Sequence, residues 1–543
     1  MKKIAFVGAP GSGKAQPYYS KILTPSGWVN MGDTYVGMDV LSYNGEKAKI
    51  TGVFDQGIKN ISRISFYDGR TVDCCDEHLW NVYSRNRRTI QILPTNIIKN
   101  KIENSKEYFT IPLFSPKETK DIKIQMESYL LGALLGNGGF SSGSIIFSSN
   151  DEDILIKLAS TLDYYGCCLK KIKQQKYDYR IIKNPLIKGK QNNIKNIITD
   201  FGLFGCKSHE KFIPKCYFNV SLKQKIELIR GLMDTDGFAG KNGGLSYSTT
   251  SKQLAKDFQN LIFSIGGIAT IKEKVTSYTY KNEKKQGRIC YIINIRYNKP
   301  YELFSLTRKK ERLLKYQYED CLRNRIIKIE NIGQEKCRCI MIDHPDHLYV
   351  TDNYIITHNT TTCHDVFVKL KKKKHKVELI SEYAREYIQK HGAPESIYEQ
   401  YSIYTEQKNR EQNIPQNIDY VVMDVLPCLS FFYASKYANY DNPRERIVLQ
   451  DLYKILLDDL VLKRYDYIFF IPTNQTYSTD AKDILNDGVR YHSEDDISVI
   501  EQHMDLMFNK LHNYGNVYRL DCPIEERSKT VMNILLDKKS PEE

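Results

Sequence analysis

The first stretch of this chain with residue types suited to phosphate chemistry is one residue short of a complete motif. A short apolar run at 4–7 leads into GAPGSGK, whose glycines and final lysine are spaced as in loops that wrap the phosphates of a nucleotide. Such a loop requires a serine or threonine next, because that hydroxyl binds the accompanying Mg²⁺. Ala15 stands there instead, followed by Gln16 and the helix-unfriendly Pro17.

The missing hydroxyl occurs at Thr360, in the stretch YIITHNTTTCHDVFVKL, where three threonines lead into apolar residues at helical spacing. Joining Lys14 to Thr360 restores GAPGSGKTTT. An ordinary inserted domain favours an exposed loop tip, whereas this interruption separates two residues that must contact one triphosphate. We therefore predict that 15–359 is a removable segment.

The restored loop predicts an ATP site. Its backbone N–H groups would hold the β-phosphate, Lys14 would neutralise the γ-phosphate, and Thr360 would bind Mg²⁺. The expected nucleotide-binding residues are Gly8, Gly11, Ser12, Gly13, Lys14, Thr360 and Thr361. Asp424, at the end of DYVVMD, is a candidate Mg²⁺-associated carboxylate or substrate contact; the alternative is a polar strand terminus.

The downstream end of the segment, His358-Asn359-Thr360, has chemistry of its own. The Asn359 amide can attack its own backbone carbonyl and so cleave the following peptide bond, while His358 protonates the leaving group. The hydroxyl of Thr360 can hold the upstream fragment as an ester. At the seam that repairs the phosphate loop, this tripeptide predicts autocatalytic protein splicing.

These ends resemble those of an intein, a self-splicing insert. AQPYYSKILTPSGW, DGRTVDCCDEHLW and CRCIMIDHPDHLYVTDNYIITHN are similar to the family's opening strands, its Thr-x-x-His segment and its closing strands. In the second segment His78 stands at the histidine position and Cys75 replaces the usual threonine. The resemblance implies a compact, mostly antiparallel β fold of the Hint type that brings both splice junctions together.

Ala15 cannot attack the preceding carbonyl as the usual first cysteine or serine does. Either Thr360 attacks directly, or an internal thiol does, and a thiol is the better nucleophile near neutral pH. Trp80, Cys339 and Thr360 together resemble the class 3 inteins, which implies that Cys339 takes the Lys14 acyl group and passes it to Thr360. Cys337 is the nearest rival thiol, and the alternatives for Cys339 and Trp80 are plain core positions.

The middle of the segment contains two similar stretches, LLGALLGNGGF at 130–140 and LIRGLMDTDGFAG at 228–240. Each predicts an apolar helix with small residues that allow close helix packing, ending in an amide or acid. They resemble the LAGLIDADG homing endonucleases, which implies an α+β domain that binds double-stranded DNA and Mg²⁺. Asp236 and Asn137 take the metal-ligand positions and Lys211, in HEKFIPKCYF, the catalytic-lysine position. Because Asn137 brings no charge, we expect a nickase or a decayed enzyme; two inactive core helices are the alternative.

The residues outside the segment predict a doubly wound α/β domain. Short apolar strands (IAFVG, KVELI, DYVVMDV, DYIFFIP, NVYRLD) alternate with helices, which favours a parallel sheet with ATP at its C-terminal edge. SEYAREYI and DILNDGVRYHSEDD resemble nicotinamide ribonucleotide-type kinases and related P-loop NTPases. The resemblance makes Glu382, Arg385, Asp487 and Arg490 substrate or phosphoryl-transfer candidates, with a nucleoside or nucleotide as substrate. A regulatory ATPase is the alternative.

The composition of the chain is consistent with these predicted domains. The 543 residues are too many for one core, and a formal net charge of +14 with dense lysine in the middle suits DNA binding. Thirteen cysteines and no membrane-spanning apolar run favour a cytoplasmic protein. The predicted domains are 1–14 and 360–543 (host), 15–104 and 316–359 (splicing domain) and 105–315 (endonuclease).

Overall fold

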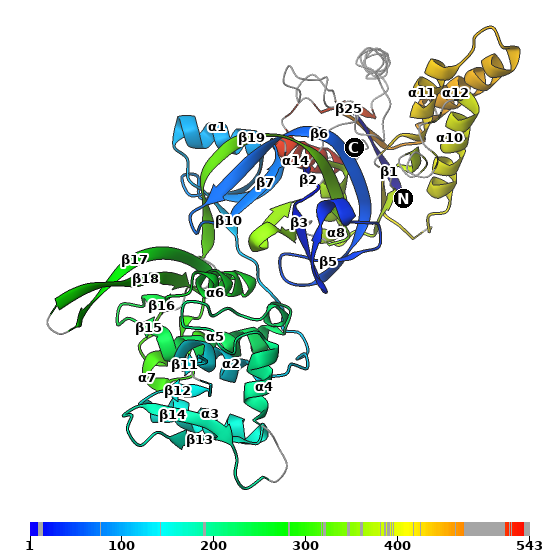
Figure 1. The fold of residues 1–543 in the computed structure, drawn as a ribbon. Helices are drawn as coiled ribbons and strands as arrows, with labels where there is room; N and C mark the ends of the chain where they lie inside the picture. The colour runs from blue at the N-terminus through cyan, green and yellow to red at the C-terminus, as the bar shows by residue number, and fades with distance from the viewer. Residues whose placement is uncertain are drawn as a thin grey trace.

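The structure is a computed structural model. It describes residues 1–8, 15–76, 78–141, 143–187, 192–280, 283–316, 318, 322–344, 348–358, 362–380, 382–384, 387, 391, 394, 396–415, 417–423, 425–461, 463–471, 516–520, 522 and 524–536. These residues form three units with separate sheets (Figure 1). Among them, no helix is both long and apolar enough to cross a bilayer.

The first unit is a parallel sheet built from both ends of the chain. Its strands lie in the order β22-β23-β1-β24-β25, and each neighbouring pair is parallel. Parallel strands covered on both faces are apolar, and Ile4, Ala5 and Phe6 of β1 are buried. The predicted parallel sheet is therefore confirmed. Its elements are β1 (Lys2–Gly8), α8 (Thr362–Lys372), β22 (Val377–Ile380), α10 (Ile397–Gln412), β23 (Tyr420–Met423), α11 (Ser430–Tyr437), α12 (Pro443–Val461), β24 (Tyr467–Ile471), β25 (Val517–Arg519) and α14 (Ile524–Leu536).

The two sides of the predicted seam share one core in this unit. Ile4 and Phe6 of β1 pack in the same apolar cluster as Cys363 and Val366 of α8. Lys3 also forms a 2.5 Å ion pair with the buried Glu411 of α10. The strand before the inserted segment and the helix after it therefore belong to one folded body.

The second unit is antiparallel β structure. One eight-stranded sheet contains the path β5-β6-β19-β10-β8-β9, with β2 on β19 and β7 on β6, and a four-stranded sheet has the order β21-β20-β3-β4. Its elements are β2 (Gln16–Pro17), β3 (Lys21–Thr24), β4 (Gly27–Asn30), β5 (Asp39–Leu41), β6 (Lys47–Phe66), β7 (Thr71–Cys75), β8 (Leu79–Ser84), β9 (Thr89–Pro94), α1 (Thr95–Ser105), β10 (Phe109–Pro112), β19 (Arg323–Ile342), β20 (Leu348–Thr351) and β21 (Ile355–His358). Because β10 pairs with β8 and β19, this sheet continues past residue 104, where the sequence placed the domain boundary.

The third unit, coloured cyan to green in Figure 1, is an internal duplication. Two antiparallel sheets, β11-β12-β14-β13 and β15-β16-β18-β17, have the same strand order, and each follows one helix of a central pair, α2 and α5. The first half contains α2 (Ser128–Asn137), β11 (Gly138–Gly139), β12 (Ile146–Ser148), α3 (Glu152–Tyr164), β13 (Cys167–Lys171), β14 (Asp178–Lys183) and α4 (Asn193–Asp200). The second contains α5 (Leu222–Asp236), β15 (Gly237–Ala239), β16 (Leu245–Thr249), α6 (Lys252–Ser264), β17 (Ile268–Tyr280), β18 (Glu283–Arg296) and α7 (Thr307–Lys310).

Candidate functional site

The upstream end of the inserted segment is held by two hydrogen bonds to one residue. The Ala15 N–H donates to Cys75 Sγ at 3.2 Å, and the Cys75 N–H donates to the Ala15 carbonyl at 3.0 Å. Ala15 is fully buried, so these partners replace water for its backbone. Cys75, at the end of β7, thus lies at the position where the sequence predicts the upstream splice bond.

A second thiol completes this environment. Ala15, Ile61, Cys75 and Cys337 form one apolar cluster. Cys337 reaches it because β19 pairs with β2, with Cys337 opposite Pro17. Burial raises the pKa of Cys337 well above its usual value, with a smaller contribution from Cys75. The Cys337 side chain is therefore a neutral thiol at physiological pH.

Cys339, the predicted nucleophile, lies further along β19 opposite Phe54 and is half-buried. Its thiol lies 3.7 Å from the Ile340 carbonyl. Burial raises the pKa of Tyr349, and the charges that Cys339, Cys74 and Cys75 would carry as thiolates act in the same direction. The structure places Cys337, rather than Cys339, in the apolar cluster with Ala15.

His78 and Trp80 connect the upstream segment to the downstream end. His78 Nε2 is hydrogen-bonded to Thr357 Oγ1, and its ring lies edge-on to Trp80 with centroids 5.1 Å apart. Trp80 donates its indole N–H to Thr95 Oγ1 at 2.9 Å, and Thr95 donates to the His78 carbonyl at 3.1 Å. Buried Trp80 therefore fixes the backbone and ring of His78.

A second polar link joins the two ends. Tyr349, opposite Thr357 in the β20–β21 pair, donates its hydroxyl to Gln16 Oε1 at 2.8 Å. The Gln16 amide in turn donates to Thr351 Oγ1 at 3.0 Å. Residues 15–16 and residues 349–357, near the two ends of the segment, thus lie at one site. Asn359 and Thr360 lie outside the described residues, and His358 is described only as the last residue of β21.

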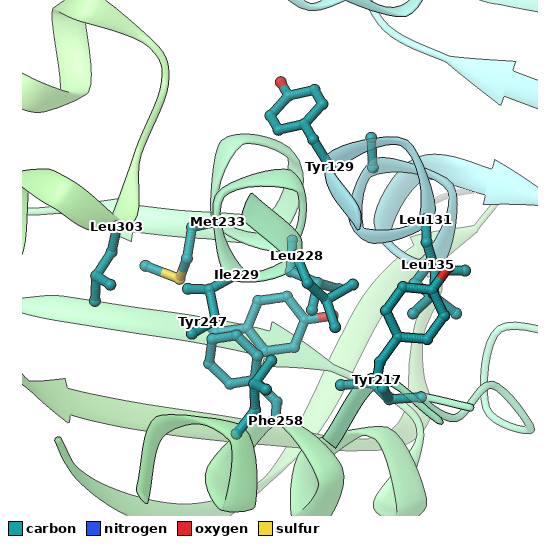
Figure 2. Close-up of a cluster of buried hydrophobic side chains, with 14 of the residues drawn as sticks. Tyr129, Leu131, Leu135, Tyr217, Leu228, Ile229, Met233, Tyr247, Phe258 and Leu303 are labelled. Atoms are coloured by element: carbon teal, nitrogen blue, oxygen red, sulfur yellow. The ribbon is translucent and has the colours of Figure 1, made fainter. Parts of the chain in front are cut away.

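The paired helices of the third unit approach as closely as backbones can. A Cβ on Gly132 would lie 2.3 Å from the Leu228 carbonyl, and one on Gly231 would lie 2.3 Å from that of Tyr129. The two motifs predicted small residues at the helix contact, and the structure leaves room for glycine alone at these two positions. Beneath the helices lies a core that includes Tyr217, Tyr247 and Phe258 (Figure 2).

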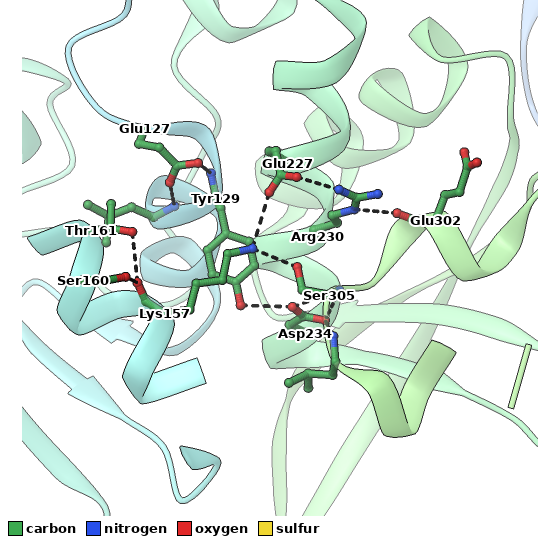
Figure 3. A network of polar contacts seen from close by, with 12 residues as sticks. Glu127, Tyr129, Lys157, Ser160, Thr161, Glu227, Arg230, Asp234, Glu302 and Ser305 are labelled. Carbon is green, nitrogen blue, oxygen red and sulfur yellow. Dashed lines mark hydrogen bonds and ion pairs between the residues drawn. The ribbon is translucent and has the colours of Figure 1, made fainter. Parts of the chain in front are cut away.

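A buried polar network fixes the second helix (Figure 3). Tyr129 donates its hydroxyl to Asp234 at 3.0 Å, and the backbone N–H of Ser305 donates to the same carboxylate at 3.0 Å. Lys157 lies over the Tyr129 ring, 3.4 Å from its centroid, and donates to Ser305 Oγ. Asp234 therefore has a structural role between the two halves.

Asp236 and Asn137 end the two helices, as predicted. Asp236 Oδ2 lies 3.2 Å from where a Cβ on Gly136 would stand, so the carboxylate is beside the residue before Asn137. Burial raises the pKa of Asp236, while Lys211 and Lys309 act in the opposite direction.

Two buried lysines occupy equivalent places at these helix ends. Lys211 Nζ donates to the carbonyls of Leu135 at 2.7 Å and Gly138 at 2.6 Å. Lys309 Nζ donates to three carbonyls at the end of α5, including that of Gly237 at 2.8 Å. Burial lowers the pKa of each lysine to about 8. Lys211 was predicted from its motif and Lys309 was not, although each lies at nearly the same offset, 73 and 72 residues, from the carbonyl it binds.

These residues fit a Mg²⁺ ion that takes most of its ligands from elsewhere. Mg²⁺ in phosphoryl chemistry is bound by one or two carboxylates together with substrate phosphates and water, and Asp236 and Asn137 offer one carboxylate and one amide oxygen. Within the described part of the chain, no three His, Cys, Asp or Glu side chains gather as a metal site.

The nucleotide site falls largely outside the described residues. Gly8 ends β1 at the C-terminal edge of the parallel sheet, and Glu382 follows β22 at the same edge. The residues that lie outside are Gly11, Ser12, Gly13, Lys14, Thr360, Thr361, Arg385, Asp424, Asp487 and Arg490.

Comparisons with known proteins agree with part of this picture. Residues 223–305 match the model of the LAGLIDADG-like domain, so the chain contains a domain of that type. Among curated proteins, the replicative DNA helicase DnaB of Mycobacterium intracellulare is 23% identical over 387 residues, 66% of this chain and 60% of that protein. The DnaB of Rhodothermus marinus is 25% identical over 266 residues, 47% of this chain and 26% of that protein.

Several solved structures align with this chain, all at low TM-scores. A variant of the gp41-1 intein is 11% identical, covering 64% of this chain and 100% of its own, at a TM-score of 0.20. A mutant of the Ssp DnaB mini-intein is 10% identical, covering 64% of this chain and 98% of its own, at 0.21. Variants of the homing endonuclease I-DmoI are 13% identical, covering 33% and 92%, at 0.22. Overlaps of this size define no fold.

Proposed function

We propose that this chain is a self-splicing precursor that excises 15–359 and joins Lys14 to Thr360. One observation carries the proposal: residues close to both ends of the segment lie at one buried site, through Ala15 with Cys75 and through His78 with Thr357, while the flanking β1 and α8 pack in one core. Any inserted domain has its ends close together, but the thiols and the histidine near these ends are groups that splicing uses and that a permanent insertion does not require.

The proposed reaction follows from the residues at the seam. Cys339 attacks the Lys14 carbonyl, and the acyl group passes to the Thr360 hydroxyl. Asn359 then cyclises with the help of His358, which releases the insert, and an O-to-N shift leaves a normal peptide bond. The presence of Cys337 beside Ala15 keeps it a rival to Cys339, and direct attack by Thr360 is the third route.

The product would bind ATP and Mg²⁺ through GAPGSGKTTT and act as a nucleoside or nucleotide kinase-like phosphotransferase, with a regulatory ATPase as the alternative. Support comes from the parallel sheet whose central strand leads into the loop. Glu382, Arg385, Asp487 and Arg490 are proposed to contact substrate or the transferred phosphate, and Asp424 the metal or substrate.

Because the curated relatives are named replicative DNA helicases, a helicase is another candidate for the host protein. The residues outside the insert, 1–14 and 360–543, number only 198, whereas the Rhodothermus marinus match runs over 266 residues. That match must therefore extend into 15–359, and its name does not assign the host. Nucleoside phosphorylation by the spliced product would support the kinase; DNA strand separation in its place would support the helicase.

The insert is further proposed to be a DNA endonuclease of weakened activity. The LAGLIDADG-like match, the paired helices and the single carboxylate Asp236 at their ends support this reading. Duplex DNA of the uninterrupted host gene is the expected substrate, with Mg²⁺ as the metal.

Mass spectrometry of the freshly expressed chain tests the central proposal. Splicing predicts two products, the excised insert and a host protein containing the peptide GAPGSGKTTT. An Asn359→Ala precursor should give neither and should hydrolyse ATP far more slowly than the spliced host. An intact chain as the sole product, with full ATPase activity, would refute the proposal.

A further inference from the structure

Strand β21, which leads to the predicted downstream junction, is packed between two cores. Ile355 belongs to the apolar cluster of the second unit, together with Trp80. The next residue, Ile356, belongs to the cluster that fills the third unit, together with Phe263 of α6. Neighbouring residues of a strand point to opposite faces, so one face of β21 is covered by the third unit. The strand that leads to the junction is therefore held by both units.

The turn before β21 has an unfavourable backbone conformation. A short 3-10 turn at Asp352–Tyr354 precedes the strand, and in it Asn353 and Tyr354 have φ angles of 57° and 59°. Left-handed conformations are uncommon for residues other than glycine, and they persist only where the surrounding structure holds them. The direction in which the chain enters β21 therefore depends on the contacts of these two residues.

Arg70, in the turn between β6 and β7, contacts both residues. Its Nη1 donates to the carbonyls of Asn353 at 3.3 Å and of Tyr354 at 3.4 Å. The Arg70 side chain is buried, and its Nε donates to the buried carboxylate of Asp68 at 2.9 Å. The guanidinium is a planar, rigid group, so the pairing with Asp68 fixes the direction in which Nη1 points. Arg70 thus stabilises the left-handed turn.

Helix α6 of the third unit holds this pair of charges in place. The helix lies on the side of the third unit nearest the second (Figure 1) and contacts the turn before β21. The guanidinium of Arg70 lies over the ring of Phe263, with 4.3 Å between Cζ and the ring centroid. Gln259, also on α6, donates its side-chain amide to the backbone carbonyl of Asp68 at 3.3 Å. A chain of contacts therefore runs from α6 through Arg70 to the start of β21.

The downstream reaction depends on accurate placement. The four residues of β21 separate the turn from Asn359, whose side-chain amide must meet its own backbone carbonyl. A displacement of about 1 Å can slow such a reaction by about 10²-fold. We propose that Arg70 is a positioning residue for cleavage at the downstream junction and that α6 keeps it in place, an inference that rests on the splicing reaction proposed above. The third unit then takes part in splicing as well as in binding DNA.

The test compares two variants of the full precursor, Asp68→Asn/Arg70→Met and Phe263→Leu. The double variant removes both charges, so no buried charge is left unpaired. Downstream cleavage is measured in a Thr360→Ala background, and upstream cleavage as branched-intermediate formation in an Asn359→Ala background. We expect downstream cleavage to slow at least about tenfold in the double variant and about threefold in Phe263→Leu, with upstream rates within about twofold of wild type.

Phe147→Leu is the matched control, because Phe147 is a buried phenylalanine of the same apolar cluster and lies on β12, in the other half of the third unit. Both of its rates should stay within about twofold of wild type. Equal losses of both steps in the double variant would show that Arg70 only maintains the fold and would overturn the inference. Downstream cleavage in Phe263→Leu as fast as in Phe147→Leu would also overturn it. A wild-type precursor that does not splice would instead refute the proposed function.

Discussion

His78 and Thr357 are 279 residues apart in the chain, and the ring of one is hydrogen-bonded to the hydroxyl of the other. This bond links the loop after β7 to the strand that ends at the downstream junction. Because Trp80 and Thr95 hold the His78 backbone, the ring has little freedom to turn away. The motif near the upstream end is therefore held against the strand that leads to the predicted downstream junction.

Removing that bond should slow downstream cleavage selectively. Thr357→Val keeps the shape of the side chain and removes its hydroxyl, so the His78 imidazole loses its hydrogen-bond partner. We expect downstream cleavage to slow about tenfold in this variant and by more in His78→Ala. Gel quantification of the downstream product over time measures both. Thr89→Val, at an exposed position of β9 in the eight-stranded sheet, is the control and should behave as wild type.

The nucleophile can be identified by comparing the two thiols of β19. Cys339→Ala should abolish the branched thioester, whereas Cys337→Ala should retain it with a modest loss from poorer packing beside Ala15. Hydroxylamine cleaves a thioester, so gels of treated samples show which of the two variants still forms the branched thioester. The reverse result would assign attack to Cys337, and full ligation in both variants would leave Thr360 as the nucleophile.

The endonuclease should gain activity from one restored charge. Asn137→Asp gives the helix pair its second carboxylate, and we expect at least a tenfold rise in double-strand cutting relative to nicking, because both phosphates could then bind metal. Asp236→Asn should remove cutting of either kind. Supercoiled plasmid carrying the uninterrupted host gene separates nicked from linear product. No gain from Asn137→Asp would show that Asn137 is not the limiting residue.

Because α2 and α5 approach closely, we expect one added methyl group between them to lower the free energy of unfolding substantially. Gly231→Ala would place a Cβ 2.3 Å from the Tyr129 carbonyl, and relieving that overlap should destabilise the insert by about 1–3 kcal/mol. Urea unfolding of the Asn359→Ala precursor measures it. Gly139→Ala, whose added Cβ meets only atoms of Ile146 at 3.8 Å, is the matched control and should cost little.

Buried lysines predict an unusual pH dependence of stability. Burial lowers the folded-state pKa of Lys211, Lys225 and Lys309 to about 8, below the ordinary value of 10.5. Between these two pH values the unfolded chain binds more protons than the folded one, so stability should rise with pH across that window.

Comparing urea unfolding at about pH 8 and about pH 10 measures this rise. Lys309→Met should make the slope shallower, because no charge remains to be buried. Lys241→Met, at an exposed lysine, should leave the slope as it is. Equal slopes in wild type and Lys309→Met would contradict the assignment.

Much of the architecture could be predicted from local sequence patterns. Alternating apolar strands and helices predicted the parallel sheet, and the glycine spacing of the repeated motifs predicted the helix pair. Lys309 was missed because its segment carries no motif; only the repeat offset from Lys211 could have pointed to it.

The placement of the thiols was not readable in this way. Strand alternation would treat Cys337 and Cys339 alike. In the last six residues of β19, however, the buried positions are Cys337, Ile340 and Ile342, since the pairing with β6 is irregular there. The contact of Cys75 with Ala15 likewise depends on β2 and β7 meeting, which no short stretch of sequence encodes.

The position of β1 has a consequence for the carrier of this insert. Loss of an edge strand would break hydrogen bonds to one neighbouring strand only. By contrast, β1 is hydrogen-bonded on both sides, to β23 and β24. A precursor that severed its backbone and never resealed it would leave its carrier with a broken middle strand and no continuous phosphate loop. If 15–359 is excised as proposed, an inaccurate excision would destroy the protein that carries the insert, so the insert could be maintained at this position only if its splicing were accurate.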